Sequence, residues 1–305
     1  MSDSLDNLLQ GLKAVAEPTR LRLLALLSGG ELTVTEICEV IGQSQPRVSR
    51  HLKVLCEAGL LDRFREQHWV YYRVAVDGRS GALARRLLDL LPQADASLEL
   101  DRERCDRVIA ARVSGQRATV GDATEQGGAV ARELGRILLV ELGDAGVGEL
   151  LDIGTGQGHL LRELAPQARH ATGIDVSPDA LRVARTQLYV AGLGRCQIKR
   201  GDMYRIEAAD DSFDTVTMDR VLADAADPQA ALLEAARALR ASGRLAIVED
   251  FEALASSGTA NPLATLREWL TRAGFSCLRL HPVDTAAGHL VIAIGAPASA
   301  AHAAA

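Results

Sequence analysis

The stretch Leu150-Leu-Asp-Ile-Gly-Thr-Gly-Gln-Gly158 determines the fold that we predict for the second half of the chain. A short apolar run ends in three glycines at alternate positions, and Leu160, Leu161 and Leu164 then follow a helical spacing. This pattern predicts a strand, a tight turn and a helix. Because glycine lacks a Cβ, a ligand can approach the main chain of such a turn closely. The spacing G-x-G-x-G differs from the G-x-G-x-x-G of dinucleotide-binding folds, which points away from NAD.

Further strands with acidic ends follow that turn. Residues 171–175 form a second apolar run that ends in an acid, where a ribose-binding carboxylate belongs in nucleotide-binding folds. The later pattern predicts strands over 196–199, 213–218 and 245–249, a helix over 228–240, and a final antiparallel pair of strands near 274–280 and 288–294 after a helix over 263–273. We therefore predict an α/β Rossmann-like domain over residues 149–296.

At these residues the chain resembles the class I S-adenosylmethionine (SAM) dependent methyltransferases. The resemblance implies that the glycine turn and Asp152 cradle the methionine part of SAM, that Asp175 accepts from the ribose hydroxyls, and that Asp202 accepts from the adenine amino group. An ionised carboxylate is an acceptor-only group, which suits these donors. SAM or its product S-adenosylhomocysteine (SAH) is the implied cofactor. The implied binding set is Asp152, Gly154, Thr155, Gly156, Gly158, Asp175, Val176, Asp202, Met203 and Asp219.

Charge is distributed unevenly along the 305 residues, a length sufficient for two domains with separate cores. Acids outnumber bases by 40 to 34, so the total indicates no general affinity for nucleic acid. Residues 43–73 differ, because they contain six bases against three acids. A basic island of this kind can contact phosphates without a basic total charge.

The remaining composition indicates a cytoplasmic protein. The acidic start of the chain lacks the charged and apolar regions of a signal peptide, and no apolar run approaches the length of a membrane-spanning helix. Five cysteines are scattered and form no C-x-x-C pair, which favours reduced thiols over a disulfide framework.

A helix-turn-helix is predicted near the N-terminus. A first helix is expected over 1–13, a second over 18–27, and two short helices over 33–41 and 44–55 are separated by a turn at Gly42. In the last helix Val48, Leu52 and Leu55 fall on one face, while the bases at 47, 50 and 53 centre on the opposite face. A buried stripe backed by a basic one suits a helix that lies in the major groove of DNA, although a solvated charged face gives the same pattern.

Two β-type runs around a polar tip follow, over residues 59–74, which predicts a hairpin directly after that helix. With the motifs at 16–24 and 45–60, this arrangement resembles the ArsR/SmtB family of dimeric winged-helix repressors. The resemblance implies a homodimer and double-stranded operator DNA as partner. The implied DNA-binding residues are Ser44, Gln45, Arg47, Ser49, Arg50, His51, Lys53, Arg65 and Arg73.

The chain departs from the metal sensors of that family. Thr33 and Thr35 stand where those proteins carry a pair of thiolates, and threonine is a poor ligand for a soft metal. The helix expected over 81–91 contains no histidine, which the other familiar metal site requires. We therefore expect no metal.

The predicted organisation has four parts. Residues 1–92 form a winged-helix DNA-binding and dimerisation domain with an α+β fold, 93–148 a helical linker or lid region, 149–296 the SAM-binding domain, and 297–305 a disordered tail. Residues 93–104 are expected to be a linker, and 252–262 a short flexible stretch. Fused repressors of this kind commonly place aromatic side chains over the cofactor from the connecting region, but here no aromatic residue occurs between Arg73 and Tyr189.

Catalytic residues are not identified by the sequence. Asp219, Arg220, Asp224 and Asp227 follow the fourth strand, yet no convergent acid–base pair and no amino-methylation motif is present. Two interpretations remain open. The chain is a homodimeric transcription regulator, expected to be a repressor, that senses SAM or SAH, or it is an active small-molecule methyltransferase whose winged helix regulates its own gene.

Overall fold

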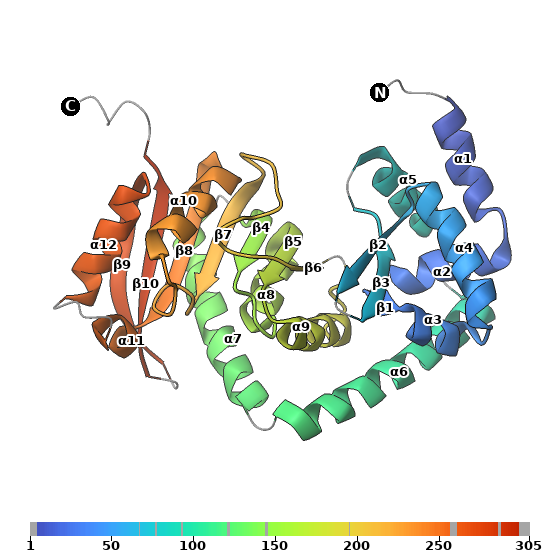
Figure 1. The fold of residues 1–305 in the computed structure, drawn as a ribbon, viewed down its shortest axis with the longest axis horizontal. Coiled ribbons are helices and arrows are strands. Elements are labelled where there is room, and N and C mark those ends of the chain that lie inside the picture. The colour runs from blue at the N-terminus through green and yellow to red at the C-terminus, as the bar shows by residue number, and fades with distance from the viewer. Residues whose placement is uncertain are drawn as a thin grey trace. The chain divides into compact units, whose positions relative to one another are not determined.

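The computed structural model describes residues 5–66, 68–76, 78–92, 94–120, 123–143, 146–194, 196–256, 261–285 and 288–298. The chain divides into two compact units (Figure 1). The first comprises residues 1–119 and 188–195, and the second comprises residues 120–187 and 196–305. The expected disordered tail lies outside the described residues from 299 onward, whereas Pro297 is the last residue of a strand.

Five helices and a small sheet make up most of the first unit. The helices are α1 (Leu5–Val15), α2 (Pro18–Leu27), α3 (Val34–Ile41), α4 (Gln45–Glu57) and α5 (Gly78–Asp89). Leu23, Ile37 and Leu52 are fully buried in one core cluster, to which α2, α3 and α4 each contribute. The predicted helix-turn-helix, α3 followed by α4, is confirmed, and Gly42 ends α3 in the left-handed conformation that the tight turn requires.

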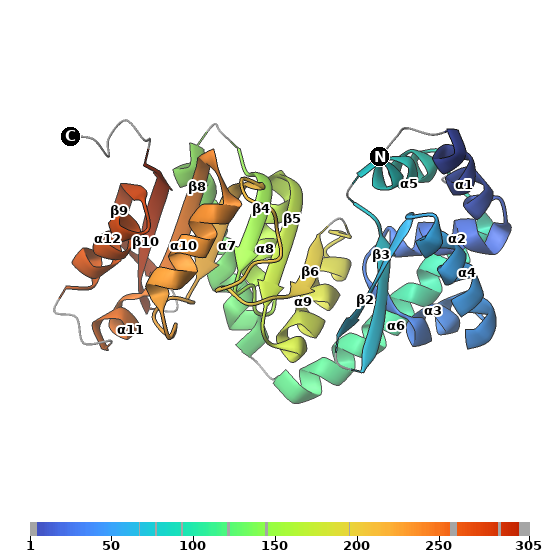
Figure 2. The same ribbon diagram turned by 45° about the horizontal axis from the view of Figure 1, so that its top comes forward.

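The predicted hairpin is also confirmed. Strands β2 (Leu61–Glu66) and β3 (Trp69–Val74) pair antiparallel, and β1 (Leu32–Thr33) adds to β3, giving the strand order β1-β3-β2. Figure 2 shows the two long strands as a pair beside the helices. Along β2 the end residues Leu61 and Glu66 are buried, whereas Arg63 and Arg65 between them are exposed.

The region expected to be a linker is largely a helix. Helix α6 runs over Ala96–Val120, so the linker prediction for 93–104 is wrong from Ala96 onward. The Asp95 carboxylate accepts from the N–H groups of Ser97 and Leu98, which fixes the start of that helix. The sequence pattern there is weak because charged residues are spread around the helix. Helix α7 (Ala123–Leu142) follows, as the helical assignment to residue 148 predicts.

A seven-stranded sheet forms the centre of the second unit. Its strands are β4 (Gly148–Ile153), β5 (Ala168–Asp175), β6 (Gln197–Arg200), β7 (Phe213–Asp219), β8 (Leu239–Asp250), β9 (Phe275–Thr285) and β10 (Gly288–Pro297). The order is β6-β5-β4-β7-β8-β10-β9; the first five are parallel to one another, and β10 is antiparallel to both β8 and β9. The predicted Rossmann-like fold and its final antiparallel pair are confirmed.

Helices flank this sheet. They are α8 (His159–Leu164), α9 (Pro178–Val190), α10 (Pro228–Ala238), α11 (Phe251–Ser256) and α12 (Pro262–Arg272), with a short 3-10 turn at Ala165–Gln167. Leu232 of α10 and Leu266 of α12 share one core cluster with Ile153 and Met218, so these helices cover one face of the sheet. Several boundaries differ from prediction: β5 begins three residues earlier than expected, β8 begins at Leu239 rather than at residue 245, and β9 extends to Thr285. The helix expected to end at 240 ends at Ala238, where β8 begins, and residues 252–256 of the stretch expected to be flexible are helical.

Candidate DNA-binding surface and ligand site

Helix α4 presents the two faces that its sequence predicts. Val48, Leu52 and Leu55 are fully buried, whereas Arg47 and Arg50 are exposed. Ser44 occupies the N-cap position with extended backbone, and its side chain makes no capping hydrogen bond. The serine itself is exposed to solvent. The cationic face of α4 therefore lies in solvent while the apolar face fixes the helix to the core.

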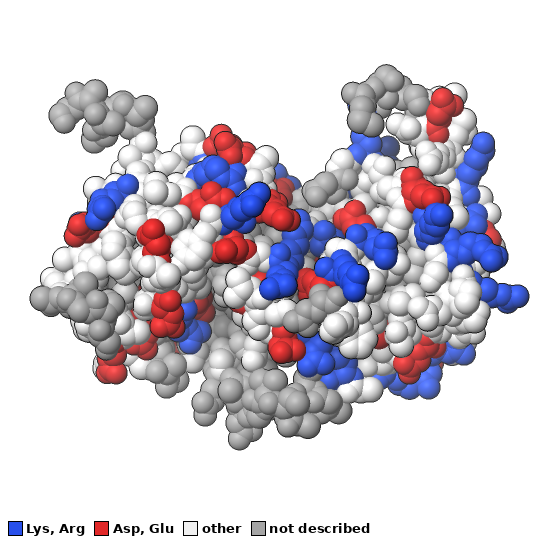
Figure 3. Space-filling model, in the orientation of Figure 1, with Lys and Arg blue, Asp and Glu red and all other residues white. Residues whose placement is uncertain are grey.

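The other expected DNA contacts lie on or near this surface. Gln45 and Lys53 are exposed, and Lys53 makes only a loose ion pair with Glu57, 3.7 Å between Nζ and Oε1. Ser49 and His51 are half-buried, and His51 Nδ1 lies 3.5 Å from a Glu17 carboxylate oxygen. Figure 3 shows Lys and Arg side chains at the right of the view, where α4 lies in Figure 1. Hydrated cations of this kind are available to phosphates.

The wing, which is the hairpin of β2 and β3, carries two of the expected DNA contacts. One lies at its surface and the other is largely buried. Arg65 on β2 is exposed. Arg73 on β3 is only 12% exposed; its Nη1 donates to Glu31 at 3.0 Å, its Nε donates to Asp62 at 3.2 Å, and its guanidinium lies over the Phe64 ring. This network ties β3 to β2 and to the residue that precedes β1. We therefore assign Arg73 to bracing the wing and do not propose it as a DNA contact.

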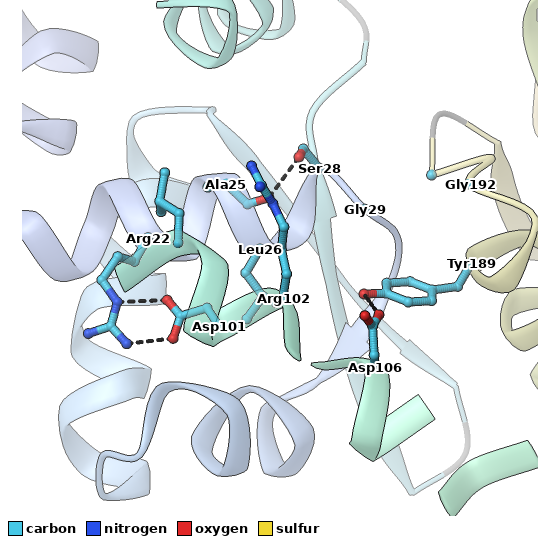
Figure 4. Close-up of a pocket in the computed structure, with 12 residues that line it drawn as sticks. Arg22, Ala25, Leu26, Ser28, Gly29, Asp101, Arg102, Asp106, Tyr189 and Gly192 are labelled. Atoms are coloured by element: carbon cyan, nitrogen blue, oxygen red, sulfur yellow. Dashed lines mark hydrogen bonds and ion pairs between the residues drawn. The ribbon is translucent and has the colours of Figure 1, made fainter. Parts of the chain in front are cut away.

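Helix α6 is fastened to the helix-turn-helix inside the first unit. Arg112 Nε donates to Glu36 of α3 at 2.9 Å, and Arg104 Nη1 donates to the Val40 carbonyl at 3.3 Å near the other end of α3. Figure 4 shows a third attachment, the parallel pair of hydrogen bonds from Arg22 of α2 to Asp101 at 2.7 and 2.6 Å. The pair borders a hollow of about 300 Å³. Sequence reasoning missed this clamp because its partners lie 64 to 79 positions apart.

The glycine turn lies where the strand order of the large sheet reverses. Strand β4 pairs with β5 on one side and with β7 on the other, so the carboxyl ends of these three strands meet at a topological switch point, where open α/β sheets bind ligands. Gly154, Gly156 and Gly158 all adopt positive φ, between 53° and 77°. A Cβ on Gly154 would lie 2.4 Å from Val221, so side chains are excluded there. The turn therefore has the geometry expected of a ligand cradle.

Asp175 holds that turn from the end of β5. One carboxylate oxygen accepts from the N–H of Gly156 at 2.9 Å, and the other accepts from the N–H of Ser177 at 2.8 Å. Ile153 and Ile174 are register partners, which brings the residues after them together. Thr155 donates its backbone N–H to the Ile174 carbonyl. The structure thus places Asp175 beside the glycine turn, as predicted.

Asp152 is a buried carboxylate beneath the turn. It is 2% exposed, and the Thr217 hydroxyl donates to it at 2.6 Å. Burial raises its pKa to about 7, and the neighbouring side chains of Thr155 and Thr217 offset only part of this rise. An ammonium group brought beside this carboxylate would favour its ionised form, so the carboxylate suits the amino-acid end of a ligand.

The remaining expected cofactor residues border the same sheet edge. Val176 is 61% exposed next to Asp175, which suits an apolar wall for a planar base. Asp202 is exposed and accepts from the Tyr204 N–H at 3.0 Å through one of its two oxygens. Met203 packs against the core cluster. These positions fit the group that the resemblance implies.

The turn after β7 contains features that sequence reasoning missed. The guanidinium of Arg220 donates two parallel hydrogen bonds, each 2.9 Å long, to the carboxylate of the preceding residue, Asp219. Glu249 is completely buried, and one of its oxygens accepts from the N–H groups of Val221 and Leu222 at 2.9 and 2.6 Å. Burial raises the pKa of Glu249 to about 7 in spite of the bonds from Leu222, Val221 and Ala223. The only sequence feature that could have indicated this buried acid is the position of Glu249 at the end of the apolar run 245–249.

The described part of the chain contains no group of three or more His, Cys, Asp or Glu side chains arranged to hold a metal ion. Its five cysteines are all free thiols. Thr33, which stands at an expected thiolate position, instead caps α3 reciprocally with Glu36. None of the described helices combines the length and apolarity that crossing a membrane requires.

Comparisons with known proteins match both units. The arsR family of bacterial regulatory proteins matches residues 17–63, and a methyltransferase domain family matches residues 147–275. The arsenical resistance operon repressor of Escherichia coli is 46% identical over 68 residues, which cover 22% of this chain and 58% of that protein. The transcriptional repressor SdpR of Bacillus subtilis is 38% identical over 60 residues, covering 20% of this chain and 67% of the repressor.

The chain is also similar in fold to the solved structure of a SAM-dependent methyltransferase from Aquifex aeolicus. The match has 19% sequence identity and a TM-score of 0.45, and it covers 59% of this chain and 97% of that protein's chain. The observed folds and the two family matches define the class: a winged helix-turn-helix domain joined to a Rossmann-like methyltransferase domain. Its N-terminal domain belongs to the arsR family of bacterial regulatory proteins. The chain spans between 58% and 67% of the length of the two regulators named above.

Proposed function

We propose that the protein is a homodimeric, DNA-binding transcription regulator, acting as a repressor, whose methyltransferase-like domain binds SAM or SAH as a signal. The observation that carries this proposal is the pairing, on one chain, of an exposed cationic recognition helix with a glycine-turn site whose acids are committed to binding or to the fold. The arsR-family domain supports DNA as the partner. Operator DNA would be contacted through Gln45, Arg47, Arg50 and Lys53 of α4, with Arg65 from the wing.

The commitment of the acids favours sensing over methyl transfer. A general base must have a free acceptor within reach of the proton that it removes. Asp219 is occupied by Arg220, and Asp227 accepts from the Ala230 N–H as the N-cap of α10. Asp224 is exposed to solvent. Methyl transfer can proceed by orientation alone when the acceptor carries no proton of high pKa, and the complete glycine turn keeps an active methyltransferase with an autoregulatory winged helix as the second candidate.

The homodimer is supported by an uncovered apolar face on α1. Four leucines at helical spacing are between 40% and 71% exposed, namely Leu5, Leu8, Leu9 and Leu12. A stripe of this kind is normally covered by a partner. A second copy of α1 would bury it symmetrically, and a dimer presents two recognition helices to two half-sites of DNA.

Two sets of contacts, one inside each unit, support coupling between ligand and DNA. In the second unit α7 packs along α8, and the His159 ring lies 3.2 Å from the position of a Cβ on Gly127. In the first unit α6 is clamped to α3 by Arg104 and Arg112. Because α6 and α7 follow one another along the chain, a ligand that shifts α8 can bias the helix-turn-helix.

The test is a titration of a DNA fragment from the protein's own promoter with protein alone, with saturating SAM and with saturating SAH. Coupling of about 1 to 3 kcal/mol, the usual range, would change DNA affinity about 5- to 150-fold, and linkage requires DNA to change ligand affinity equally. Light scattering on the DNA-free protein measures its molar mass, which tests whether it is a dimer. Three identical curves from protein shown calorimetrically to bind both ligands would reject sensing and favour the enzyme.

A further inference from the structure

We propose that Arg220 is a specificity-determining residue that sets the charge preference of the ligand site, so that the site takes the uncharged thioether SAH in preference to the sulfonium SAM. The proposal rests on the proposed function, because it concerns which of the two ligands the same site selects. It is carried by the turn that follows β7 and by the ion pair within that turn.

The turn after β7 lies directly against the glycine turn. Ile153 and Met218 are register partners on adjacent parallel strands, so Gly154 and Asp219 are the next residues on each strand. Val221 fills the space that a Cβ on Gly154 would occupy, at a distance of 2.4 Å. In the proposed binding mode, the adenosine end is held at Asp175 and the amino-acid end at Asp152. The sulfur joins these two ends, which places it over the turn that Val221 touches.

The backbone of Arg220 is held in an uncommon conformation. Its φ is 54°, in the left-handed region that L side chains rarely adopt. Its N–H donates to the Val248 carbonyl at 2.7 Å, and the buried Glu249 accepts from the next two N–H groups. A strained residue that its surroundings hold this firmly is a candidate for function. Here the result is a guanidinium turned back onto Asp219.

Asp219 is therefore not available to a cationic ligand. Its side chain is 12% exposed, and both of its oxygens accept from Arg220. The hydrogen bonds to Asp219 raise the pKa of Arg220, so the guanidinium stays positively charged. Nearby, burial and the charges of Arg162 and Arg220 lower the pKa of His159, which favours its uncharged form. A sulfonium over this turn would meet a neutralised carboxylate and an exposed cation.

The two ligands differ here by one methyl group and one positive charge. Asp152 pairs with the ammonium group that both ligands carry, so it does not discriminate between them. A like charge near the protein surface disfavours a cation appreciably at separations of a few ångströms. We expect the ratio of the SAM dissociation constant to the SAH dissociation constant to exceed one, and to change by about tenfold when the charge of Arg220 is removed, equivalent to about 1.4 kcal/mol.

The experiment is calorimetric titration of SAM and SAH into the full-length protein and three variants. Arg220→Gln frees Asp219 and should lower the SAM-to-SAH ratio about tenfold. Asp219→Asn leaves the cation without its partner and should raise the ratio. Arg240→Gln is the matched control, because Arg240 pairs with Asp214 at 2.7 Å near the opposite end of β7 and should leave the ratio unchanged.

The outcomes separate the two proposals. A wild-type protein that binds neither ligand overturns the proposed function. If the wild-type protein binds both ligands and SAM binds more tightly, the role of Arg220 is overturned and ligand sensing stays intact. The same conclusion follows if Arg220→Gln and Asp219→Asn share one ratio of the SAM to the SAH dissociation constant. Thermal unfolding without ligand checks that each variant is folded, and changes in absolute affinity that move both ligands equally count against the charge argument.

Discussion

The recognition helix and the glycine-turn site use charge in opposite ways. On α4 the cations at Arg47, Arg50 and Lys53 are exposed, and the ion pair from Lys53 to Glu57 spans 3.7 Å. Beneath the glycine turn the Asp152 carboxylate is 2% exposed, and under the adjacent turn after β7 the Glu249 carboxylate is 0% exposed; burial raises the pKa of each to about 7. One region keeps its charges hydrated, and the other removes them from water.

The difference indicates what each region can bind. Hydrated surface charges cost the fold little and interact with any polyanion, with a strength that falls as salt rises. Buried carboxylates without a cationic partner destabilise the empty protein, because hydrogen bonds offset only part of the cost of burial, and a ligand whose groups match them would offset more. On this view the first unit sacrifices no stability for DNA, whereas a bound ligand would stabilise the second unit through mass action.

The largest effect is expected from Asp152→Asn. The pKa of this carboxyl is higher in the fold than its ordinary value of 3.8, so its stabilising contribution is complete below about pH 4 and is lost as the pH rises through about 7. The neutral amide avoids this loss, so the ligand-free variant should be the more stable protein above pH 7, by at most about 4 kcal/mol. Urea unfolding at pH 5, 6, 7 and 8 measures the difference.

Asp214→Asn is the control with the opposite sign. Burial alone would raise the pKa of Asp214, but hydrogen bonds from Arg240 and from the Glu149 N–H outweigh that effect, so the pKa is lowered. Its stabilising contribution is therefore present above its ordinary value and is lost in acid, so the amide variant should be the less stable protein at pH 7. Parallel stability curves for wild type and Asp152→Asn would contradict the comparison. The Asp152→Asn variant should also bind SAH more weakly, because the ammonium loses its counter-charge.

Asp175→Ala should weaken both SAM and SAH binding by tenfold or more. In the proposed binding mode the substitution removes two charge-assisted hydrogen bonds to the ribose, each contributing roughly 1.5 kcal/mol or more. It also releases the N–H groups of Gly156 and Ser177. Asp179→Ala, at an exposed acid in the first turn of α9, is the control. Unchanged dissociation constants would return Asp175 to the role of a turn-bracing acid alone.

The sequence predicted what is local and periodic. The glycine turn, the acid after β5 and the apolar face of α4 each follow from residues within one turn or strand, and the structure places them as expected. Contacts between distant residues were out of reach. The α6 clamp joins Arg112 to Glu36, and the Arg220 turn depends on Glu249 from another strand. Arg73 shows the converse limit, because the sequence does not distinguish an exposed cation in a basic island from one that is paired with acids, as Arg73 is with Glu31 and Asp62.

Arg112→Gln should reduce the coupling between ligand and DNA several-fold while leaving ligand affinity of the DNA-free protein unchanged. The guanidinium is 10% exposed and fastens α6 to Glu36, the residue that completes the capping box of α3. Loss of that pair lets α6 move without carrying α3 with it. Arg107→Gln is the matched control, since the only contact described for Arg107 is a bond to a carbonyl within α6. The measurement is the ratio of DNA dissociation constants with and without SAH, and a ratio equal to that of wild type would exclude α6 from transmission.

The smallest effect should come from Arg50→Ala, and its form matters more than its size. If Arg50 contacts a phosphate, its loss weakens all DNA binding by a similar factor and lowers the slope of log affinity against log salt by about one; if it contacts a base, the cost is about 1 to 3 kcal/mol at a single base pair. Because Arg50 is exposed, neither thermal stability nor SAH affinity should change. Arg73→Gln gives the contrast, because it breaks the bonds to Glu31 and Asp62 and should lower stability while leaving the salt slope unaltered. Fluorescence anisotropy with a promoter fragment and with an unrelated duplex, at several salt concentrations, separates these cases. An Arg50→Ala variant that binds both duplexes as wild type does would remove α4 from the DNA-binding surface.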